Sequence, residues 1–174
     1  MPAKLTVTQD NIAKIQKALR DLSRTTVCVG IPESKTKRRD PDKITNATLG
    51  YIHEYGSPAN NIPARRWLKP GIEASRATWE GFLQQAATFA MEGRPETVDK
   101  ALHAAGDTAV QSVKNYITAG ISPPLKPRTM AARRAKHRNT KTGPSPLPPQ
   151  FGGLTPLVDT SQMLNSITYT VVKK

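Results

Sequence analysis

Cysteine is almost absent from this chain of 174 residues, and the single Cys28 excludes both an internal disulfide and a zinc site made of cysteines. Long apolar runs are absent too, since none approaches the roughly 20 residues of a membrane-spanning helix. The first residues lack the apolar core of a signal peptide. We therefore expect a soluble product, made in the cytoplasm and without a membrane partner.

Residue patterns typical of enzymes are also missing. The sequence contains no phosphate-binding loop, no catalytic triad and no pair of carboxylates suited to acid–base catalysis. His53-Glu54 begins like a zinc-protease motif, but Ser57 occupies the position of the required second histidine. Cys28 has no histidine or acid near it in sequence, so we predict a small, buried or half-buried residue rather than a nucleophile. These absences predict a protein that is not an enzyme and uses no metal or cofactor.

Acidic residues are scarce, 13 against 26 lysines and arginines, which gives a formal net charge of +13. A charge of this size indicates a polyanionic partner or environment. No acidic residue occurs between Asp107 and Asp159, and that interval includes residues 122–156, which hold eight of the 15 prolines. We call residues 122–156 the basic arm. Its central run of basic side chains consists of Lys126, Arg128, Arg133, Arg134, Lys136, Arg138 and Lys141.

The basic arm has three interpretations: it binds nucleic acid, it embraces a neighbouring subunit, or it is solvated and disordered. A short helix is predicted over residues 129–137, between extended flanks of polyproline type. The basic run contains no aromatic residue, so a contact with nucleic acid would be made to phosphates, independently of sequence. We favour an arm that lies across a neighbour and is ordered only on assembly, because its apolar content is too low for it to fold against its own domain.

Hydrophobic periodicity predicts one α+β domain made of residues 1–121 and 157–174. Residues 25–31 and 167–172 alternate in the manner of half-buried strands. A lone strand cannot satisfy its backbone, so we expect these first and last strands to pair in one small antiparallel or mixed sheet. Apolar residues at steps of three or four predict helices that pack against this sheet. These helices cover residues 9–22, 46–55, 72–91 and 96–118, and a short one capped by Asp159 or Thr160 precedes the last strand.

Residues 53–72 form a stiff joint between two predicted helices. Gly56 suits the left-handed residue that ends a helix, and Pro63 keeps the residue before it extended. Such a joint holds Trp67 and Leu68 at a fixed place relative to both helices. We predict that these two residues are anchors, buried against those helices or against a neighbouring subunit.

The joint and the C-terminal region also resemble a known family. In the joint, a predicted helix is followed by Tyr55-Gly56, a polar loop and the run Ile62-Pro63-Ala64-Arg65-Arg66-Trp67-Leu68. This order resembles the Glu-Phe-Gly…Ile-Pro-x-Arg-Pro-Phe-Leu signature of tailed-bacteriophage tail-completion proteins, in the head–tail joining group. The run Leu157-Val158-Asp159-Thr160-Ser161-Gln162-Met163-Leu164-Asn165-Ser166-Ile167 is similar to the family's Leu-x-Asp-Thr-Gly-x-Leu-x-x-Ser-Ile. The chain departs from these signatures at Arg66, Trp67 and Ser161. The resemblance covers residues 24–92 and 154–173.

The resemblance implies a structural virion protein of the phage neck or tail, made in the host cytoplasm. It implies a homo-oligomeric ring, of six copies, that surrounds the DNA channel between a head connector or stopper protein and the tail tube. Assembly contacts are expected on the matching residues, which are Tyr55, Gly56, Pro63, Arg65, Trp67, Leu68, Asp159, Thr160 and Leu164. The alternative, from charge alone, is a nucleic-acid-binding protein that holds double-stranded DNA through residues 126–141.

Overall fold

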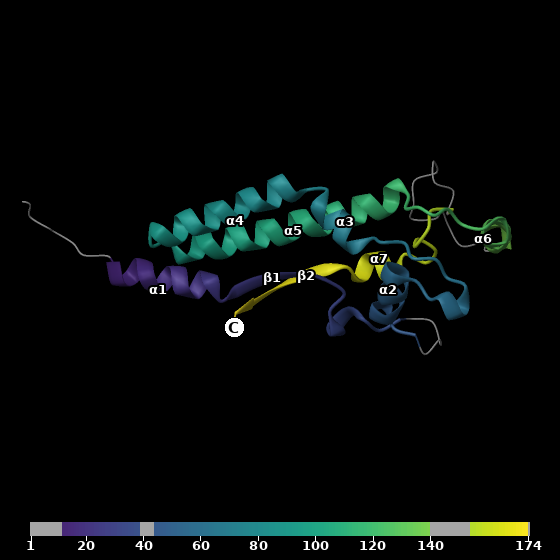
Figure 1. The fold of residues 1–174 in the computed structure, drawn as a ribbon, viewed down its shortest axis with the longest axis horizontal. Coiled ribbons are helices and arrows are strands. Elements are labelled where there is room, and N and C mark those ends of the chain that lie inside the picture. Colours follow the sequence, from purple (N-terminus) through teal and green to yellow (C-terminus); the bar gives the residue numbers. More distant parts are fainter. Residues whose placement is uncertain (1–11, 39–43, 140–153, 174) are drawn as a thin grey trace, which may run out of the picture.

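The computed structural model describes residues 12–38, 44–139 and 154–173 (Figure 1). Within these residues the fold is α+β, as predicted, with seven α-helices and one antiparallel sheet of two strands. The helices are α1 (Ile12–Ser23), α2 (Asn46–Tyr55), α3 (Leu68–Glu73), α4 (Arg76–Met91), α5 (Pro95–Ala119), α6 (Pro127–Asn139) and α7 (Gln162–Ser166). The strands are β1 (Thr25–Gly30) and β2 (Thr168–Lys173), and two short 3-10 turns, η1 (Glu33–Lys35) and η2 (Pro58–Asn60), lie on either side of α2.

The two strands pair with each other, which confirms the prediction that the first and last strands share one sheet. They run antiparallel, with Gly30 opposite Thr168. Val27 and Val29 pack on the helical core, whereas Cys28 points away from it. The expectation that Cys28 is buried or half-buried is wrong, because it lies on the outer face of the sheet and is exposed.

The longest helix, α5, is the centre of the fold. It lies beside α4 and crosses the inner face of both strands, and α3 packs against it (Figure 1). Its buried stripe contains three alanines and Gly106, and these small side chains let its neighbours approach closely. Gly71 of α3 lies directly against the backbone of Val113, and Gly106 lies beneath the ring of Tyr169 from β2. The sheet and α3 therefore both pack closely against α5.

The predicted helix over residues 72–91 is two helices, α3 and α4, because the chain bends between them. At the bend, the carbonyl of Ile72 accepts hydrogen bonds from the Ser75 amide at 3.3 Å and from Trp79 Nε1 at 3.0 Å. These bonds close a turn in place of the regular helical ladder. After the bend α4 packs against α5, and its Trp79 and Leu83 line a groove together with residues of β1.

The predicted cap of α7 is also wrong. The N-cap residue, directly before the helix, is Ser161, which has a φ of 58° and makes no side-chain capping bond. Asp159 lies 3.8 Å from Nε of Arg133, and Thr160 Oγ1 accepts a hydrogen bond from Gln162 Nε2 at 3.2 Å. Ser161 adopts the left-handed conformation that glycine accepts without strain.

The close contact between Gly106 and Tyr169 generates a stability prediction. A methyl group at position 106 would overlap the Tyr169 ring. We expect Gly106→Ala to lower the free energy of unfolding by about 1–2 kcal/mol, because overpacking costs more than the gain in helix propensity. Gly81→Ala in α4 is the matched control, since a methyl group there meets no atom within 4 Å and should raise stability by up to about 1 kcal/mol. Urea unfolding of both variants checks this, and equal effects would contradict it.

Candidate assembly site

The joint after α2 is a loop closed by backbone hydrogen bonds. Gly56 follows the last turn of α2 with a φ of 78°, and a side chain there would overlap the backbone of Ala64. The Arg65 amide donates to the carbonyl of His53 at 2.7 Å, which brings the end of the loop back to the helix it left. The prediction of a stiff joint at Gly56 agrees with this geometry, and only glycine fits the position without strain.

A carboxylate at the end of α2 fixes the beginning of α3. Oε2 of Glu54 accepts hydrogen bonds from the amides of Trp67 at 2.7 Å and Leu68 at 2.9 Å. The first amides of a helix have no partner within the helix, so a carboxylate placed there satisfies them and also complements the helix dipole. Sequence reasoning missed this role of Glu54. The available signal was an acidic residue directly before the Tyr55-Gly56 pair.

Trp67 is buried in the core of its own chain, the first of the two alternatives left open for it. Its side chain is 3% exposed, and its Nε1 donates to the carbonyl of Gly50 at 2.9 Å. A methyl group on Gly50 would come within 3.1 Å of the indole ring, so α2 passes directly over Trp67. Leu68 is half-buried and packs against the same cluster.

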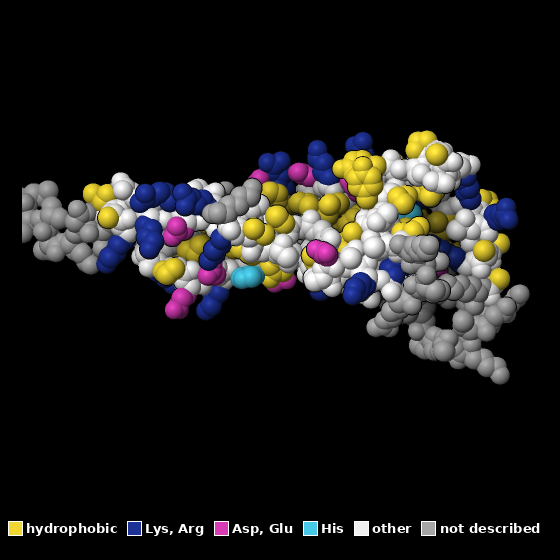
Figure 2. Space-filling view, turned by 90° about the horizontal axis from the view of Figure 1, so that it is seen from below, with side chains coloured by type: hydrophobic (Ala, Val, Ile, Leu, Met, Phe, Trp, Pro, Cys, Tyr) yellow, Lys and Arg dark blue, Asp and Glu magenta, His cyan; other side chains and the backbone are white. Residues whose placement is uncertain are grey.

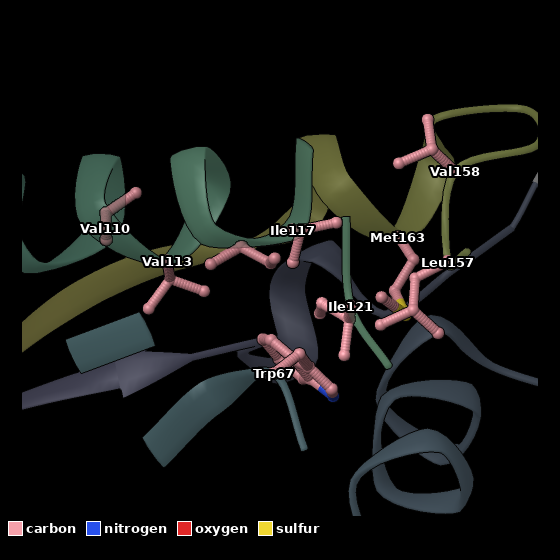
Figure 3. Close-up of a cluster of buried hydrophobic side chains, with 9 residues drawn as sticks. Trp67, Val110, Val113, Ile117, Ile121, Leu157, Val158 and Met163 are labelled. Carbon is pink, nitrogen blue, oxygen red and sulfur yellow. The ribbon is translucent and has the colours of Figure 1, made fainter. Parts of the chain in front are cut away.

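The two segments that carry the resemblance meet in this cluster (Figure 3). Trp67 comes from the joint, and Leu157, Val158 and Met163 come from the second segment. The second half of α5 contributes Val113 and Ile117 to the same cluster. The full set of buried residues is Trp67, Val110, Val113, Ile117, Ile121, Leu157, Val158, Met163 and Ile167, with Leu164 packed at its border. The two segments are thus one structural unit.

Arg65 is buried, and it holds the beginning of the basic arm. Its Nε donates to the carbonyl of Pro123 at 2.8 Å, and its Nη2 donates to that of Pro124 at 3.2 Å. Burial and the nearby charge of Arg133 lower the pKa of Arg65 from its usual value. A guanidinium with several donors in a fixed plane is suited to bind two successive carbonyls in this way.

Arg133 makes the corresponding contact at the end of the arm. Its Nη1 donates to the carbonyls of Thr155 at 2.9 Å and Val158 at 2.8 Å, and Asp159 lies beside it. Arg133 was predicted as a contact to nucleic acid or to a partner. Its side chain is only 15% exposed and is committed to its own chain, so the structure places it in a fixed internal contact instead.

These contacts correct part of the prediction for the basic arm. The expected short helix exists as α6, but residues 122–124 and 154–158 are held against their own domain and do not extend from it. The reason is that Arg65, which is buried, binds the carbonyls of Pro123 and Pro124, and that Arg133, which is half-buried, binds those of Thr155 and Val158. Such contacts need no apolar side chain in the arm. Residues 140–153 lie outside the described residues.

His53 lies next to these two arginines and is neutral at pH 7. Burial, followed by the charges of Arg65 and Arg133, lowers its pKa from 6.5 to about 4. Its Nδ1 is shielded from solvent and has no hydrogen-bond partner among the described residues. Protonation would place a third positive charge in this partly buried region, so acid should weaken the contact between joint and arm.

Two exposed tyrosines lie on the outside of the joint. The rings of Tyr51 and Tyr55 are 4.8 Å apart, and the side chains are 67% and 66% exposed. We call this pair the tyrosine patch. Large exposed aromatic side chains are frequent at protein–protein contacts. Tyr55 was predicted as an assembly residue, whereas Tyr51 was missed, although the i, i+4 spacing on a predicted helix could have identified it.

The residues that match the signatures therefore divide between the inside and the surface of the folded chain. Arg65 and Trp67 are buried and Gly56, Leu68 and Leu164 are half-buried, whereas Tyr55, Pro63, Asp159 and Thr160 are exposed. Among the basic residues of the arm, Lys126, Arg128 and Arg134 are exposed on or beside α6. The side chains of Lys136 and Arg138, and the whole of Lys141, lie outside the described residues.

Comparisons of the chain with protein-family models, curated proteins and solved structures found no match. In the part of the chain that the structure describes, no group of histidine, cysteine and acidic side chains is arranged to hold a metal ion. No helix there combines the length and the apolar character needed to cross a membrane.

Removal of the Glu54 carboxylate should destabilise the joint. Glu54→Ala leaves the amides of Trp67 and Leu68 without their acceptor, so we expect the free energy of unfolding to fall by about 2–3 kcal/mol. Glu73→Ala is the matched control, because Glu73 makes only an exposed ion pair with Arg76 at 3.5 Å. Its effect should stay below about 1 kcal/mol. Equal losses in the two variants, measured by urea unfolding, would argue against a structural role for Glu54.

The lowered pKa of His53 predicts a loss of stability in acid. The unfolded chain binds a proton at His53 below about pH 6.5, whereas the folded chain binds it only near pH 4. Between these values the unfolded state holds more protons, so stability falls as the pH is lowered. We expect a loss of about 1 kcal/mol from pH 7 to pH 5, after allowing for solvent access to the ring.

His53→Gln removes the titrating group and should flatten this part of the profile. Comparison of its urea unfolding with that of the original chain at several pH values isolates the contribution of His53. Parallel profiles for the two proteins would show that other groups cause the acid sensitivity.

Proposed function

We propose that this protein is a structural component of a tailed-phage particle that completes the tail or joins it to the head. Copies of the chain assemble as a ring, of six subunits by resemblance, that surrounds the DNA channel between a head connector or stopper and the tail tube. The observation that supports this function is the meeting of the two signature segments in one cluster, around Trp67 and Met163. The two segments lie far apart in the sequence, and yet the residues that match the two signatures pack against each other.

The joint gives a subunit of such a ring a rigid surface. Glu54 fixes α2 to α3, Trp67 fixes both to α5, and Arg65 fixes them to the arm. The tyrosine patch lies on the outside of this fixed unit. A ring needs repeated contacts of constant geometry, so an exposed aromatic pair on a rigid support is a suitable contact between neighbouring subunits.

Replacement of the tyrosine patch should therefore impair assembly without unfolding the subunit. We expect the double variant Tyr51→Ala, Tyr55→Ala to need at least ten times more protein to form rings, because the removed aromatic side chains carry binding energy only between subunits. Its melting temperature should stay close to that of the original chain, since both side chains are exposed. Light scattering after gel filtration and negative-stain images measure ring formation.

Met91→Ala is the control, because Met91 is an exposed apolar residue at the far end of α4, at 49% exposure. It should assemble like the original chain. If the unaltered chain remains a monomer at high concentration, alone and with a head-connector protein, the ring function is wrong.

Sequence-independent binding of double-stranded DNA is the second candidate function. Lys126, Arg128 and Arg134 are exposed close together in sequence on or beside α6, and they favour contact with phosphates. The same preparation distinguishes the two candidates. A monomer that binds DNA with strong salt dependence, and loses part of that dependence in Arg128→Ala, Arg134→Ala, supports this alternative over the ring.

A further inference from the structure

We propose that the groove along the outer edge of β1 binds an extended segment of another protein. This segment carries apolar side chains at every second position and acidic residues beyond one end. The inference goes beyond the ring and does not rest on it, because the groove lies within a single subunit. Its occupant is indicated by the open strand edge, the lining of the groove and the charges at its end.

The first observation is an unpaired strand edge. Within the described residues, β1 pairs with β2 on one side only. Consecutive residues of β1, from Thr25 to Val27, together with Val29, line a groove of about 470 Å³. No residue of β2 lines this groove, so it lies at the outer edge of β1. Unpaired amides and carbonyls along such an edge bind an added strand through backbone hydrogen bonds.

The second observation is the character of the lining. Its walls come from β1, α3, α4, α5 and the end of α1, and none of its side chains is charged: Leu22, Thr25, Thr26, Val27, Val29, Ile72, Trp79, Leu83, Leu102, Ala105 and Ala109. A second groove, of about 480 Å³, shares Ile72 and continues past Gly30 and Ile31. Figure 2 views the molecule from the side of the sheet and shows hydrophobic side chains gathered along its middle. The groove beside Thr25 to Val29 therefore has no charged residue in its lining, whereas the second groove, beside Gly30 and Ile31, also includes Glu54, Lys69 and Glu73.

The geometry of the groove decides between an isolated segment and a second copy of the sheet. In this fold α5 packs across the inner face of both strands, so a sheet from another copy would bring its own α5 with it. Beside the outer edge of β1, the space that this second α5 would need is occupied by α4, whose Trp79 and Leu83 line the groove. A strand without a helix on its inner face is the occupant that fits. Beside the six residues of β1 it would extend about 20 Å and place about three side chains in the groove.

The charges at one end of the groove indicate the residue type just beyond the bound strand. The groove continues, through Leu22 and Leu102, into a hollow of about 370 Å³ whose lining holds more basic than acidic residues: Arg94, Lys173, Asp21 and Asp99 lie there together with two lysines of α1, Lys14 and Lys17. Neither lysine forms an ion pair within the described residues, whereas Lys173 at the same hollow pairs with Asp99 at 3.5 Å. Figure 2 shows lysine and arginine side chains at this end of the molecule. Acidic residues just beyond the strand would meet these unpaired lysines.

A labelled peptide tests the proposal on the full chain. The probe is Glu-Glu-Val-Thr-Val-Thr-Val-Glu-Glu, which has acidic residues at both ends because the strand direction is left open. Its anisotropy and the fluorescence of Trp79 report binding, and Trp79→Phe identifies the share of the fluorescence change that comes from the groove. We expect the probe to bind at least ten times more tightly than the same peptide with alternate amides methylated, which cannot complete the hydrogen bonds of a strand.

Substitutions in and near the groove test whether the peptide binds there. Leu83→Lys puts a charge in the groove and should weaken binding at least tenfold, whereas the control Met91→Lys, on the exposed end of the same helix, should leave it unchanged. Lys14→Glu with Lys17→Glu should weaken binding severalfold and reduce its dependence on salt. Both lysines are exposed, so this pair keeps the test valid if Leu83→Lys fails to fold, as judged by circular dichroism.

Several results would overturn the proposal. If the peptide does not bind at millimolar concentration, or if the methylated peptide binds equally well, the groove does not bind an added strand. Binding that occurs only after deletion of residues 1–11 would mean that the chain's own first residues compete for the groove. An oligomer that Leu83→Lys dissociates in the absence of peptide would identify a second copy as the occupant.

Discussion

The hydrogen bonds from the Trp67 and Leu68 amides to the Glu54 carboxylate are the constraint on which the rest of the structure depends. They join the last turn of α2 to the first turn of α3 across a loop that contains no regular ladder. Once α3 is placed, Gly71 meets Val113 and the indole of Trp67 enters the core beside α5. One acidic side chain thus sets the angle between two helices and the position of the largest buried side chain.

A pair of arginines, of which Arg65 is buried and Arg133 half-buried, is the second organising feature. Arg65 and Arg133 bind four backbone carbonyls between them, and Asp159 is the carboxylate that lies beside Arg133. Two guanidinium groups this close, with a neutral histidine next to them, are held by carbonyl dipoles more than by opposite charges. Such an arrangement secures a proline-rich segment that has few apolar side chains of its own. It also explains why composition alone suggested that the segment would leave its domain.

The sequence was sufficient where local periodicity decides the structure. Strand alternation at Val27 and Val29, and the apolar stripe of α5, gave the right elements and the right pairing of the two strands. The sequence was insufficient where the role of a residue depends on a partner far away in the chain. The roles of Glu54 and Arg133 come from bonds to residues 13 or more positions away, and no local pattern specifies them. The exposure of Cys28 likewise depends on which face of the sheet the helices cover, and alternation fixes the two faces without saying which one is buried.

The pairing of β1 with β2 has a consequence for folding. β1 precedes every helix except α1, and β2 follows all of them, so the sheet joins residues that lie at opposite ends of the described chain. Closing so long a loop costs conformational entropy. The pairing of the two strands therefore becomes favourable only after the helices between them have packed. During synthesis, β1 must wait beside α5 with both edges unpaired until β2 emerges. The neutral threonine, valine and cysteine side chains of β1 offer no charge to deter other strands in that interval, so β1 is exposed to mispairing until β2 has been made.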